Sequence, residues 1–181
     1  SPRQEIRDFL ARAAKQDPRI VVSYRQANGG IVAASNDAVA LATGDYIGLL
    51  DHDDVLEPDA LAEVAAALHA DPSIDYIYTD EDLLTQDGTM RDHFRKPDWS
   101  PERFRNQMYV CHFSVIKTSL LRQVGGFRIG FDGSQDYDLM LRVTEHAHKV
   151  HHIPKILYHW RVVDGSVAAD PTAKPYAYAA G

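Results

Sequence analysis

The sequence predicts a single α/β domain in which a mostly parallel sheet is flanked by helices. Apolar, strand-like segments alternate with amphipathic, helix-like segments along most of the 181 residues, and this alternation is typical of α/β proteins. Two of the apolar segments run into acidic clusters, at 51–54 and 80–82. Because open α/β sheets bind ligands at the carboxyl ends of their strands, these clusters predict a site there.

Charge, cysteine count and the length of the apolar runs exclude several classes of protein. The formal net charge of −7 and pI near 5.6 argue against a protein that coats nucleic acid, since no basic surplus is present to neutralise phosphates. The single cysteine, Cys111, excludes an intrachain disulfide and a cysteine-based zinc cluster, and favours a reducing cytoplasm. No apolar run approaches the ~20 residues that span a bilayer.

The first half of the chain supplies the predicted elements in order. Residues 3–15 have the spacing of an amphipathic helix,, and 19–24 are β-branched and apolar, which predicts a strand. Residues 31–44 read as a helix that ends at a glycine,. The apolar run 46–51 predicts a strand buried on both faces. Pro58 opens a helix whose buried stripe is predicted to be Leu61, Val64, Ala65 and Leu68.

The second half predicts a strand at 74–82, a long surface loop at 88–104, and a strand, short helix and glycine turn at 112–127. A helix capped by Ser134 is expected over 134–147, and an extended run or strand pair over 151–161. We expect residues 1–165 to form the domain and 166–181 to form a loosely ordered tail, rich in alanine and proline,.

The stretch "LLDHDDVLEP" (49–58) places three carboxylates and an imidazole within four residues. Asp51 and Asp53 can share a divalent cation with phosphate oxygens, because Mg²⁺ commonly takes one or two protein carboxylates. The alternative is a polar turn before the next helix. The apolar strand before the cluster and Pro58 after it favour the metal site, with His52 as a spacer and Asp54 as a structural residue.

Three further groups each have two interpretations. Asp136 and Asp138 can be ordinary acids at a helix N-terminus, which their position alone favours, or one of them can be a general base. Asp80, Glu81 and Asp82 can form a solvated acidic loop or bind hydroxyl-rich ligands. His159 can be a core histidine or can complete a metal site with the aspartates.

Linked motifs give a more specific expectation. In order they are "NGGIVAASNDAVALATGDYIGLLDHDD", "YTDEDLLTQDGT", "KPDWSPERF", "GGFRIGFDGSQDYDLMLRV" and "HIPKILYHWR". This series resembles the inverting GT-A glycosyltransferases of family 2, in particular the bacterial branch that builds O-antigen and other surface polysaccharides. The resemblance covers about Asp17 to Gly165 and implies the Rossmann-like GT-A fold.

The resemblance also implies roles for individual residues. Asp51 and Asp53 match the D-x-D motif that binds Mg²⁺ or Mn²⁺ and the nucleotide diphosphate, and Asp136 matches the catalytic base, with Gln135 in place of the usual Glu. His159 matches a C-terminal histidine that coordinates the metal in some GT-A enzymes. The remaining expected contacts are with the donor, at Asn28 and Asn36, and with the acceptor, at Asp80, Glu81 and Asp82.

The chain departs from the family pattern in two places. The first nucleotide-binding strand, which ends in an Asp-Asp-Gly-Ser-like stretch, has no counterpart, so we expect an N-terminally truncated sheet; Ser35 also stands where relatives often have Arg. The expected function is therefore metal-dependent inverting transfer from a nucleotide sugar to a saccharide or lipid-linked saccharide. A non-catalytic fragment of a larger polysaccharide-synthesis protein and a metal-dependent nucleotide-sugar phosphohydrolase are the alternatives.

The expected location is the cytoplasm, at the inner face of the plasma membrane, with peripheral membrane association and no nucleic-acid partner. Exposed sheet edges predict a homodimer.

Overall fold

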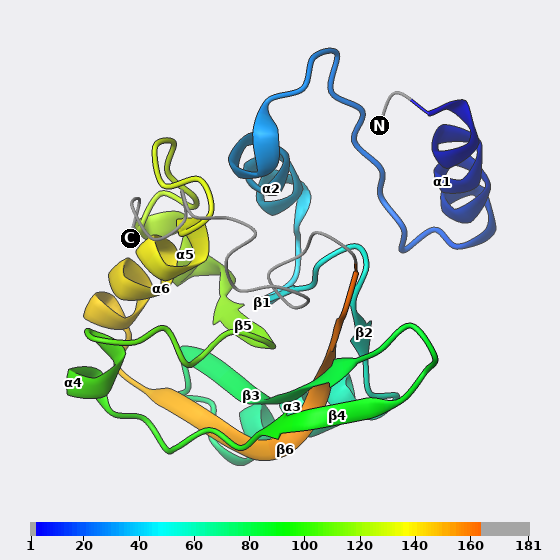
Figure 1. Cartoon of the computed structure of the whole chain (residues 1–181). Coiled ribbons are helices and arrows are strands. Elements are labelled where there is room, and N and C mark those ends of the chain that lie inside the picture. The colour runs from blue at the N-terminus through cyan, green and yellow to red at the C-terminus, as the bar shows by residue number, and fades with distance from the viewer. Residues whose placement is uncertain (1–2, 164–181) are drawn as a thin grey trace.

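A computed structural model describes residues 3–163, and Figure 1 shows a curled sheet with helices around it. No helix among these residues is long and apolar enough to cross a bilayer. The helices are α1 (Gln4–Gln16), α2 (Gly30–Leu41), α3 (Ala60–Ala70), α4 (Pro101–Phe104), α5 (Thr118–Gln123) and α6 (Gln135–His146). The strands are β1 (Tyr46–Leu49), β2 (Val55–Leu56), β3 (Tyr76–Leu84), β4 (Met90–Phe94), β5 (Ser114–Lys117) and β6 (Val150–Arg161).

The sheet is mixed, and its strand order is β1-β5-β3-β6-β2, with β4 also paired to β3. Only β3 and β6 pair in parallel, while the other four pairs are antiparallel. The expectation of a mostly parallel sheet was therefore wrong, although the α/β class is confirmed. The physical reason is that β5 lies between β1 and β3 and runs antiparallel to both, so these two strands do not pair with each other.

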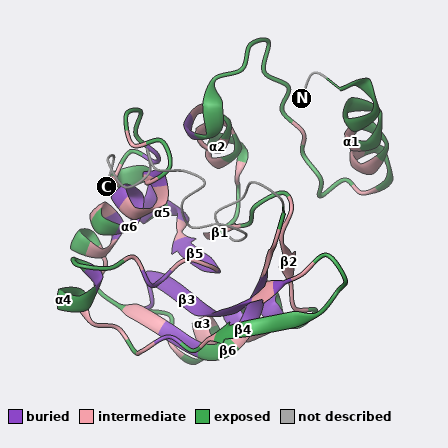
Figure 2. Ribbon diagram, viewed as in Figure 1, coloured by how far each residue is buried: buried purple, intermediate pink, exposed green. Residues whose placement is uncertain are grey.

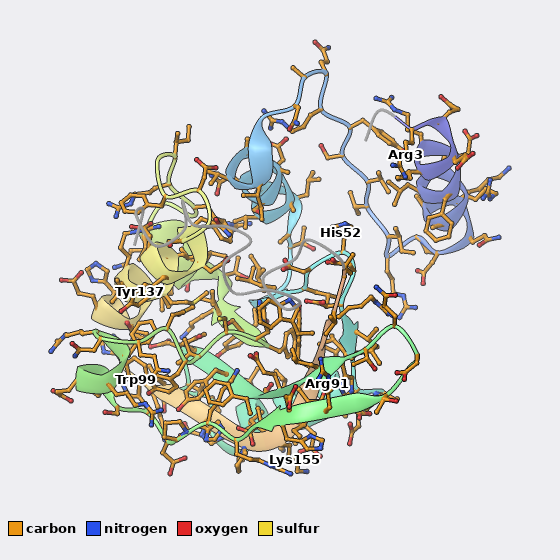
Figure 3. All side chains as sticks on the ribbon, viewed as in Figure 1. Arg3, His52, Arg91, Trp99, Tyr137 and Lys155 are labelled. Atoms are coloured by element: carbon orange, nitrogen blue, oxygen red, sulfur yellow. The ribbon has the colours of Figure 1, made fainter. Side chains whose placement is uncertain are left out.

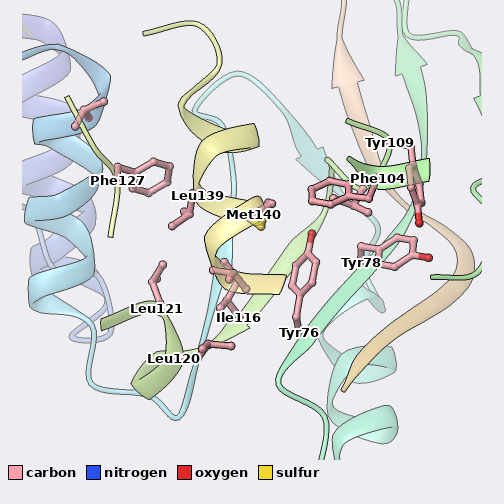
Figure 4. Packing of buried hydrophobic residues seen from close by; sticks show 13 residues of the cluster. Tyr76, Tyr78, Phe104, Tyr109, Ile116, Leu120, Leu121, Phe127, Leu139 and Met140 are labelled. Carbon is pink, nitrogen blue, oxygen red and sulfur yellow. The ribbon is translucent and has the colours of Figure 1, made fainter. Parts of the chain in front are cut away.

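Two hydrophobic cores cover the two faces of the sheet, and β3 contributes to both. Tyr76 and Tyr78 point into one core, where they meet Met140 of α6, while Ile77 points into the other, with Val64 of α3. This alternation follows from the period of two along a strand. Figure 4 shows the first core, with α6 packed beside the two tyrosines. The start of α6 is thereby fixed relative to the sheet.

The segment between α1 and α2 differs from its prediction. Residues 19–24 form no strand, residue 19 lies in a turn, and Val21 is 65% exposed. Helix α1 lies within one residue of its predicted range, 3–15, but has no buried residue, and it lies apart from the sheet in Figures 1 and 2. A strand needs a hydrogen-bonded neighbour, and none of the described strands pairs with residues 19–24.

The structure also corrects predictions for β1, for α3 and for the segment 88–104. Strand β1 is at the edge of the sheet and only half-buried, so the prediction of burial on both faces was wrong. On α3, the predicted burial of Val64 is confirmed, Leu68 is half-buried, and Leu61 and Ala65 are exposed, while Ala60 is buried as well. The expected loop at 88–104 contains β4 and α4. The predicted tail, 166–181, lies outside the described residues.

Candidate active site

Asp51 and Asp136 line one cavity of about 310 Å³. Asp51 follows the end of β1, and Asp136 lies in the first turn of α6. The wall between them includes Leu49 and Phe127. Two of the predicted site residues therefore come together from distant parts of the sequence.

The turn that carries Asp51 is fastened to strand β6. The Asp51 N–H donates to the Tyr158 hydroxyl at 3.3 Å, and that hydroxyl donates to the Asp54 carboxylate. Arg161 adds two bonds, from its N–H to Asp54 Oδ1 at 2.8 Å and from Nε to the Asp53 carbonyl at 2.6 Å. The structural role predicted for Asp54 is thus supported. The carboxylates of Asp51 and Asp53 take no part in these bonds.

His52, the predicted spacer, points into solvent. Its side chain is 96% exposed, and Figure 3 labels it at the turn after β1. Its Nδ1 lies 3.5 Å from Asp53 Oδ1, a contact worth little at an exposed position. The turn therefore presents Asp51 and Asp53 with few competing partners.

The donor set of this turn suits a hard divalent cation that is shared with a phosphorylated ligand. Among residues 3–163, no group of three or more His, Cys, Asp or Glu side chains is arranged to hold a metal ion alone. Mg²⁺ typically takes one or two carboxylates and completes its shell with water and phosphate oxygens. The carboxylates of Asp51 and Asp53, of which Asp53 has only the weak contact with His52, suit that requirement.

Asp136 is held in place by its neighbour. Gln135 Nε2 donates to Asp136 Oδ2 at 2.8 Å, and the Gly133 N–H donates to Gln135 Oε1 at 2.7 Å. Burial raises the pKa of Asp136, His112 opposes that effect, and the Asp51 carboxylate adds to it; the net pKa is above the ordinary value. A carboxylate with a raised pKa in a cavity has the properties of a general base.

Asp138, the other acid at the start of α6, has a different role. Arg128 and Arg142 both pair with its buried carboxylate. Burial opposes the charge of Asp138, but the two guanidinium groups outweigh burial and lower its pKa. Because arginine side chains occupy both carboxylate oxygens of Asp138, this residue stabilises the fold. The two acids at the start of α6 therefore differ in role because they have different partners.

The acidic cluster on β3 is buried. Asp80 Oδ1 lies 2.9 Å from His152 Nε2, and Asp82 Oδ1 lies 2.6 Å from His159 Nδ1. Asp80, Glu81 and Asp82 are all less than 9% exposed, so the solvated-loop interpretation is wrong, because these residues belong to the central strand. The expected contact with an acceptor stays a prediction that this burial does not favour.

His159 is engaged on both sides of its ring. Its Nδ1 faces Asp82, and its Nε2 lies 3.1 Å from Glu57 Oε1. Both nitrogens that could bind a metal thus have partners, and the structure does not group this ring with Asp51 and Asp53. The assignment of His159 as a metal ligand finds no support in this geometry, which favours the core-histidine alternative.

The two asparagines expected at the donor also have structural partners. Asn28 Oδ1 accepts from the Gly30 N–H at 3.0 Å, at the start of α2. The Asn36 side chain bonds to the backbone of Phe127. Their contact with the donor stays a prediction.

Sequence reasoning missed a charged group beside this site. Buried Lys96 donates to Glu81 Oε2 at 3.1 Å, and His112 Nδ1 lies 3.3 Å from the same oxygen. His112 interacts electrostatically with both Asp51 and Asp136. The available signal was a histidine within the otherwise mostly apolar run 108–116.

Comparison with known proteins gives the family. A model described as Glycosyl transferase family 2 matches residues 1–125. The chain belongs to glycosyl transferase family 2. Curated relatives of this family-2 chain include the O-antigen biosynthesis protein RfbC of Myxococcus xanthus, which is 45% identical over 89% of the chain and 12% of that protein. Chondroitin synthase of Escherichia coli is 35% identical over 77% of the chain and 20% of that enzyme.

An uncharacterised protein of Sinorhizobium fredii is 48% identical over 98% of the family-2 chain. The chain spans a fifth or less of the length of these three relatives. Each relative is therefore a much longer protein in which this sequence corresponds to one part.

Solved structures show the fold. TarS of S. aureus in complex with UDP-GlcNAc superposes with a TM-score of 0.73 at 17% identity, covering 94% of the chain and 49% of TarS. A Pyrobaculum calidifontis mannosyltransferase in complex with GDP-Man and Mn²⁺ gives 0.64 at 18% identity, covering 90% of the chain and 46% of that structure. The family-2 chain thus has the GT-A fold, as its motifs indicated.

Proposed function

We propose that the chain is the catalytic part of a metal-dependent inverting glycosyltransferase. It would move a sugar from a nucleotide-sugar donor to a hydroxyl of a polysaccharide or lipid-linked acceptor, in the cytoplasm at the inner face of the plasma membrane. The observation that carries this proposal is the cavity shared by Asp51 and Asp136. It brings two carboxylates with different surroundings to one cavity, as a metal site and a base require,.

Asp51 and Asp53 are the residues that we propose to hold a Mg²⁺ or Mn²⁺ ion and the donor diphosphate. When bound, such an ion neutralises charge that develops on the departing diphosphate. The contribution of the protein is the turn itself, because Tyr158 and Arg161 fix its backbone. The Mn²⁺ and the nucleotide sugar bound by the mannosyltransferase support this choice of ligands.

Asp136 is the residue that we propose as the base. It accepts the proton of the acceptor hydroxyl while that oxygen bonds to the anomeric carbon. The bond from that carbon to the diphosphate oxygen breaks, the electron pair leaves with the diphosphate, and the configuration inverts. Gln135 holds Oδ2 of the carboxylate, which orients the base for this single displacement.

The names of the relatives support a surface polysaccharide as the acceptor class. The similar proteins are described as O-antigen biosynthesis and chondroitin synthesis proteins. These names describe the whole relatives, of which this chain corresponds to a fifth or less. We therefore propose a surface polysaccharide as the acceptor class.

A turnover assay with Mn²⁺ and a panel of nucleotide sugars separates this function from its alternatives. The assay is run with and without oligosaccharide acceptors, and release of the nucleotide and gain of mass by the acceptor are both measured. Acceptor-dependent release with a glycosylated product supports the transferase. Equal release without any acceptor favours the phosphohydrolase, and neither release nor binding of UDP with Mn²⁺ by calorimetry favours the non-catalytic fragment.

A further inference from the structure

A second cavity, of about 480 Å³, lies between α4, α6 and the loop that joins α5 to α6. This loop and the first turn of α6 contribute to both cavities. Phe127 and Asp136 line the proposed active site, while Arg128, the residue after Phe127, and Asp138, two residues after Asp136, line the second cavity. The walls of the two cavities are thus adjacent in the chain at the proposed base.

Packing between α4 and α6 holds the wall of the second cavity. The Tyr137 hydroxyl donates to the Phe104 carbonyl at 2.7 Å, and the two rings meet edge to face with centroids 5.4 Å apart. Trp99 packs against Phe104 at 5.3 Å and is only half-buried. Figure 3 labels Trp99 and Tyr137 on these two neighbouring segments. The wall is therefore partly aromatic and joined to α6.

Arginine side chains supply most of the charge in this cavity. Arg128 and Arg142 share the single carboxylate of Asp138, with Arg128 Nε at 3.1 Å and Arg142 Nη2 at 2.6 Å from Oδ2. Arg105 also lines the cavity, and within residues 3–163 its guanidinium has no hydrogen-bond or ion-pair partner. Two guanidinium groups thus share one carboxylate, and a third has none.

The other acid of the cavity does not cancel this charge. Glu145 is exposed and, within the described part of the chain, pairs with none of the three arginines. Three arginines and two acids line the cavity, which leaves one positive charge in excess, whereas the whole chain carries −7. This local reversal of sign favours a ligand group that carries a single negative charge.

Aromatic and arginine side chains together suit an acidic sugar. The Arg128 guanidinium lies over the Phe131 ring, 4.9 Å from its centroid, and Trp99 adds a second ring to the wall. Such pockets hold the apolar faces of a ligand and orient it through a few polar groups, and a guanidinium group matches a carboxylate. A phosphate monoester carries nearly two negative charges, so a carboxylate fits the single excess charge better.

We propose that this cavity is an acceptor subsite for a sugar unit that carries a carboxylate, that is, for a uronic acid within the acceptor saccharide. The unit with the attacking hydroxyl meets Asp136, and the acidic unit lies further along the saccharide, with its carboxylate on Arg105 and its ring against Trp99. The inference rests on the proposed function for the identity of the ligand as an acceptor, while binding itself can be measured without turnover.

The first test is an NMR titration, with and without UDP and Mn²⁺. The probes are tetragalacturonate, tetramannuronate and a tetrasaccharide that alternates glucuronate with N-acetylglucosamine. Each is compared with its methyl ester, which keeps the sugar rings and removes the charge. The chain has two tryptophans, so the indole N–H of Trp160, on β6, is an internal control for that of Trp99.

We expect at least one of the three acids to shift the Trp99 indole signal and to leave the Trp160 signal in place. The methyl ester of that acid should bind about threefold to fivefold more weakly, as for the loss of an ion pair at an exposed position. No shift of Trp99 with any of the three acids, or equal binding of acid and ester, would overturn the inference.

Arg105 variants test the group that we propose to meet the carboxylate. Arg105→Gln breaks no ion pair within the described residues, so we expect a folded variant that binds the acid as weakly as the wild type binds the ester. Arg105→Lys should keep part of the preference for the acid. Arg12→Gln, exposed on α1, makes the same charge change and should bind like the wild type. An unchanged preference for the acid in Arg105→Gln rules out the proposed contact.

Turnover separates this inference from the proposed function. If the wild type transfers sugar, we expect the KM for the acidic acceptor to rise about threefold to fivefold in Arg105→Gln, with donor KM unchanged. Transfer that uses the acid no better than its ester overturns the subsite alone. If the wild type transfers nothing, the proposed function fails, and the titration decides whether this cavity binds an acidic saccharide.

Discussion

Asn36 of α2 is bonded at both ends of its amide to the backbone of Phe127. Its Nδ2 donates to the Phe127 carbonyl at 2.9 Å, and the Phe127 N–H donates to its Oδ1 at 2.9 Å. Phe127 lines the cavity between Asp51 and Asp136. One side chain thus attaches helix α2 to the wall of the proposed active site.

Replacement of Asn36 by alanine should therefore lower stability. Two partly buried backbone groups lose their partners, and we expect the free energy of unfolding to fall by about 1–3 kcal/mol, measured by urea denaturation. Asn106→Ala, which removes one exposed bond to Glu102, should change it by less than about 0.5 kcal/mol. Equal effects of the two changes would contradict the role of the Asn36 amide.

Asp138→Asn should destabilise the protein through the loss of a paired, buried charge. We expect a loss of about 2–3 kcal/mol at pH 7, below the range for fully buried pairs because Arg128 is half-exposed,. The folded-state pKa of Asp138 is lowered, so its contribution is present above about pH 4 and disappears as the pH falls through the folded pKa.

The pH dependence of stability is a more specific test of the ion pairs between Asp138 and its two arginine partners. As the pH is lowered below about 4, the stability of the wild type should fall by more than the stability of Asp138→Asn. Thermal unfolding measures both. Glu145→Gln on the exposed side of α6 serves as a control with the same charge change. Parallel stability curves for wild type and Asp138→Asn would mean that Asp138 is not an ion-pair partner in solution.

Tyr158→Phe should weaken metal binding through the turn. The change removes the hydroxyl that joins Asp51 N to the Asp54 carboxylate, and we expect a loss in Mn²⁺ affinity of about tenfold in the presence of UDP, by analogy with other residues that support metal ligands. Tyr46→Phe removes a comparable hydroxyl, bonded to the Ile74 carbonyl, and should leave Mn²⁺ affinity unchanged. Similar affinities for both variants would show that the turn does not depend on Tyr158.

Asp51→Asn and Asp53→Asn test the metal site itself. Each change removes one anionic ligand, so calorimetric binding of UDP in the presence of Mn²⁺ should weaken by at least about tenfold. Asp59→Asn, at an exposed position before α3, controls for net charge. Tight, Mn²⁺-dependent binding by both variants would place the metal elsewhere.

Local pattern predicted the elements that carry their own hydrophobic periodicity. The α1 and α2 helices, β3 and α6 lie close to their expected ranges, and Asp51 and Asp136, two of the predicted site residues, line one cavity. The pattern could not show whether residues 19–24 have a hydrogen-bonded neighbour, because that depends on sheet order rather than on local sequence. For the same reason it could not show that β5 enters between β1 and β3.

Burial explains the missed site residues. Acids in the stretch 80–82 look solvated in sequence, but the partners that allow them to be buried, His152 and His159, lie more than 70 residues away. The pairing of Glu81 with Lys96 and His112 likewise depends on tertiary contacts. Charge compensation between distant residues is therefore the part of this site that sequence alone did not predict.

We propose that Asp136 is the base of an inverting transfer, and the Asp136→Asn variant removes that base while it keeps the shape of the side chain. Transfer of sugar to acceptor with Mn²⁺ is measured for wild type and variant, with product configuration read by NMR and UDP binding by calorimetry. We expect the wild type to invert the anomeric centre and the variant to lose at least about 100-fold in kcat, with UDP binding unchanged. Normal turnover by Asp136→Asn, or a product with retained configuration, would contradict the role of Asp136 as the base of an inverting transfer.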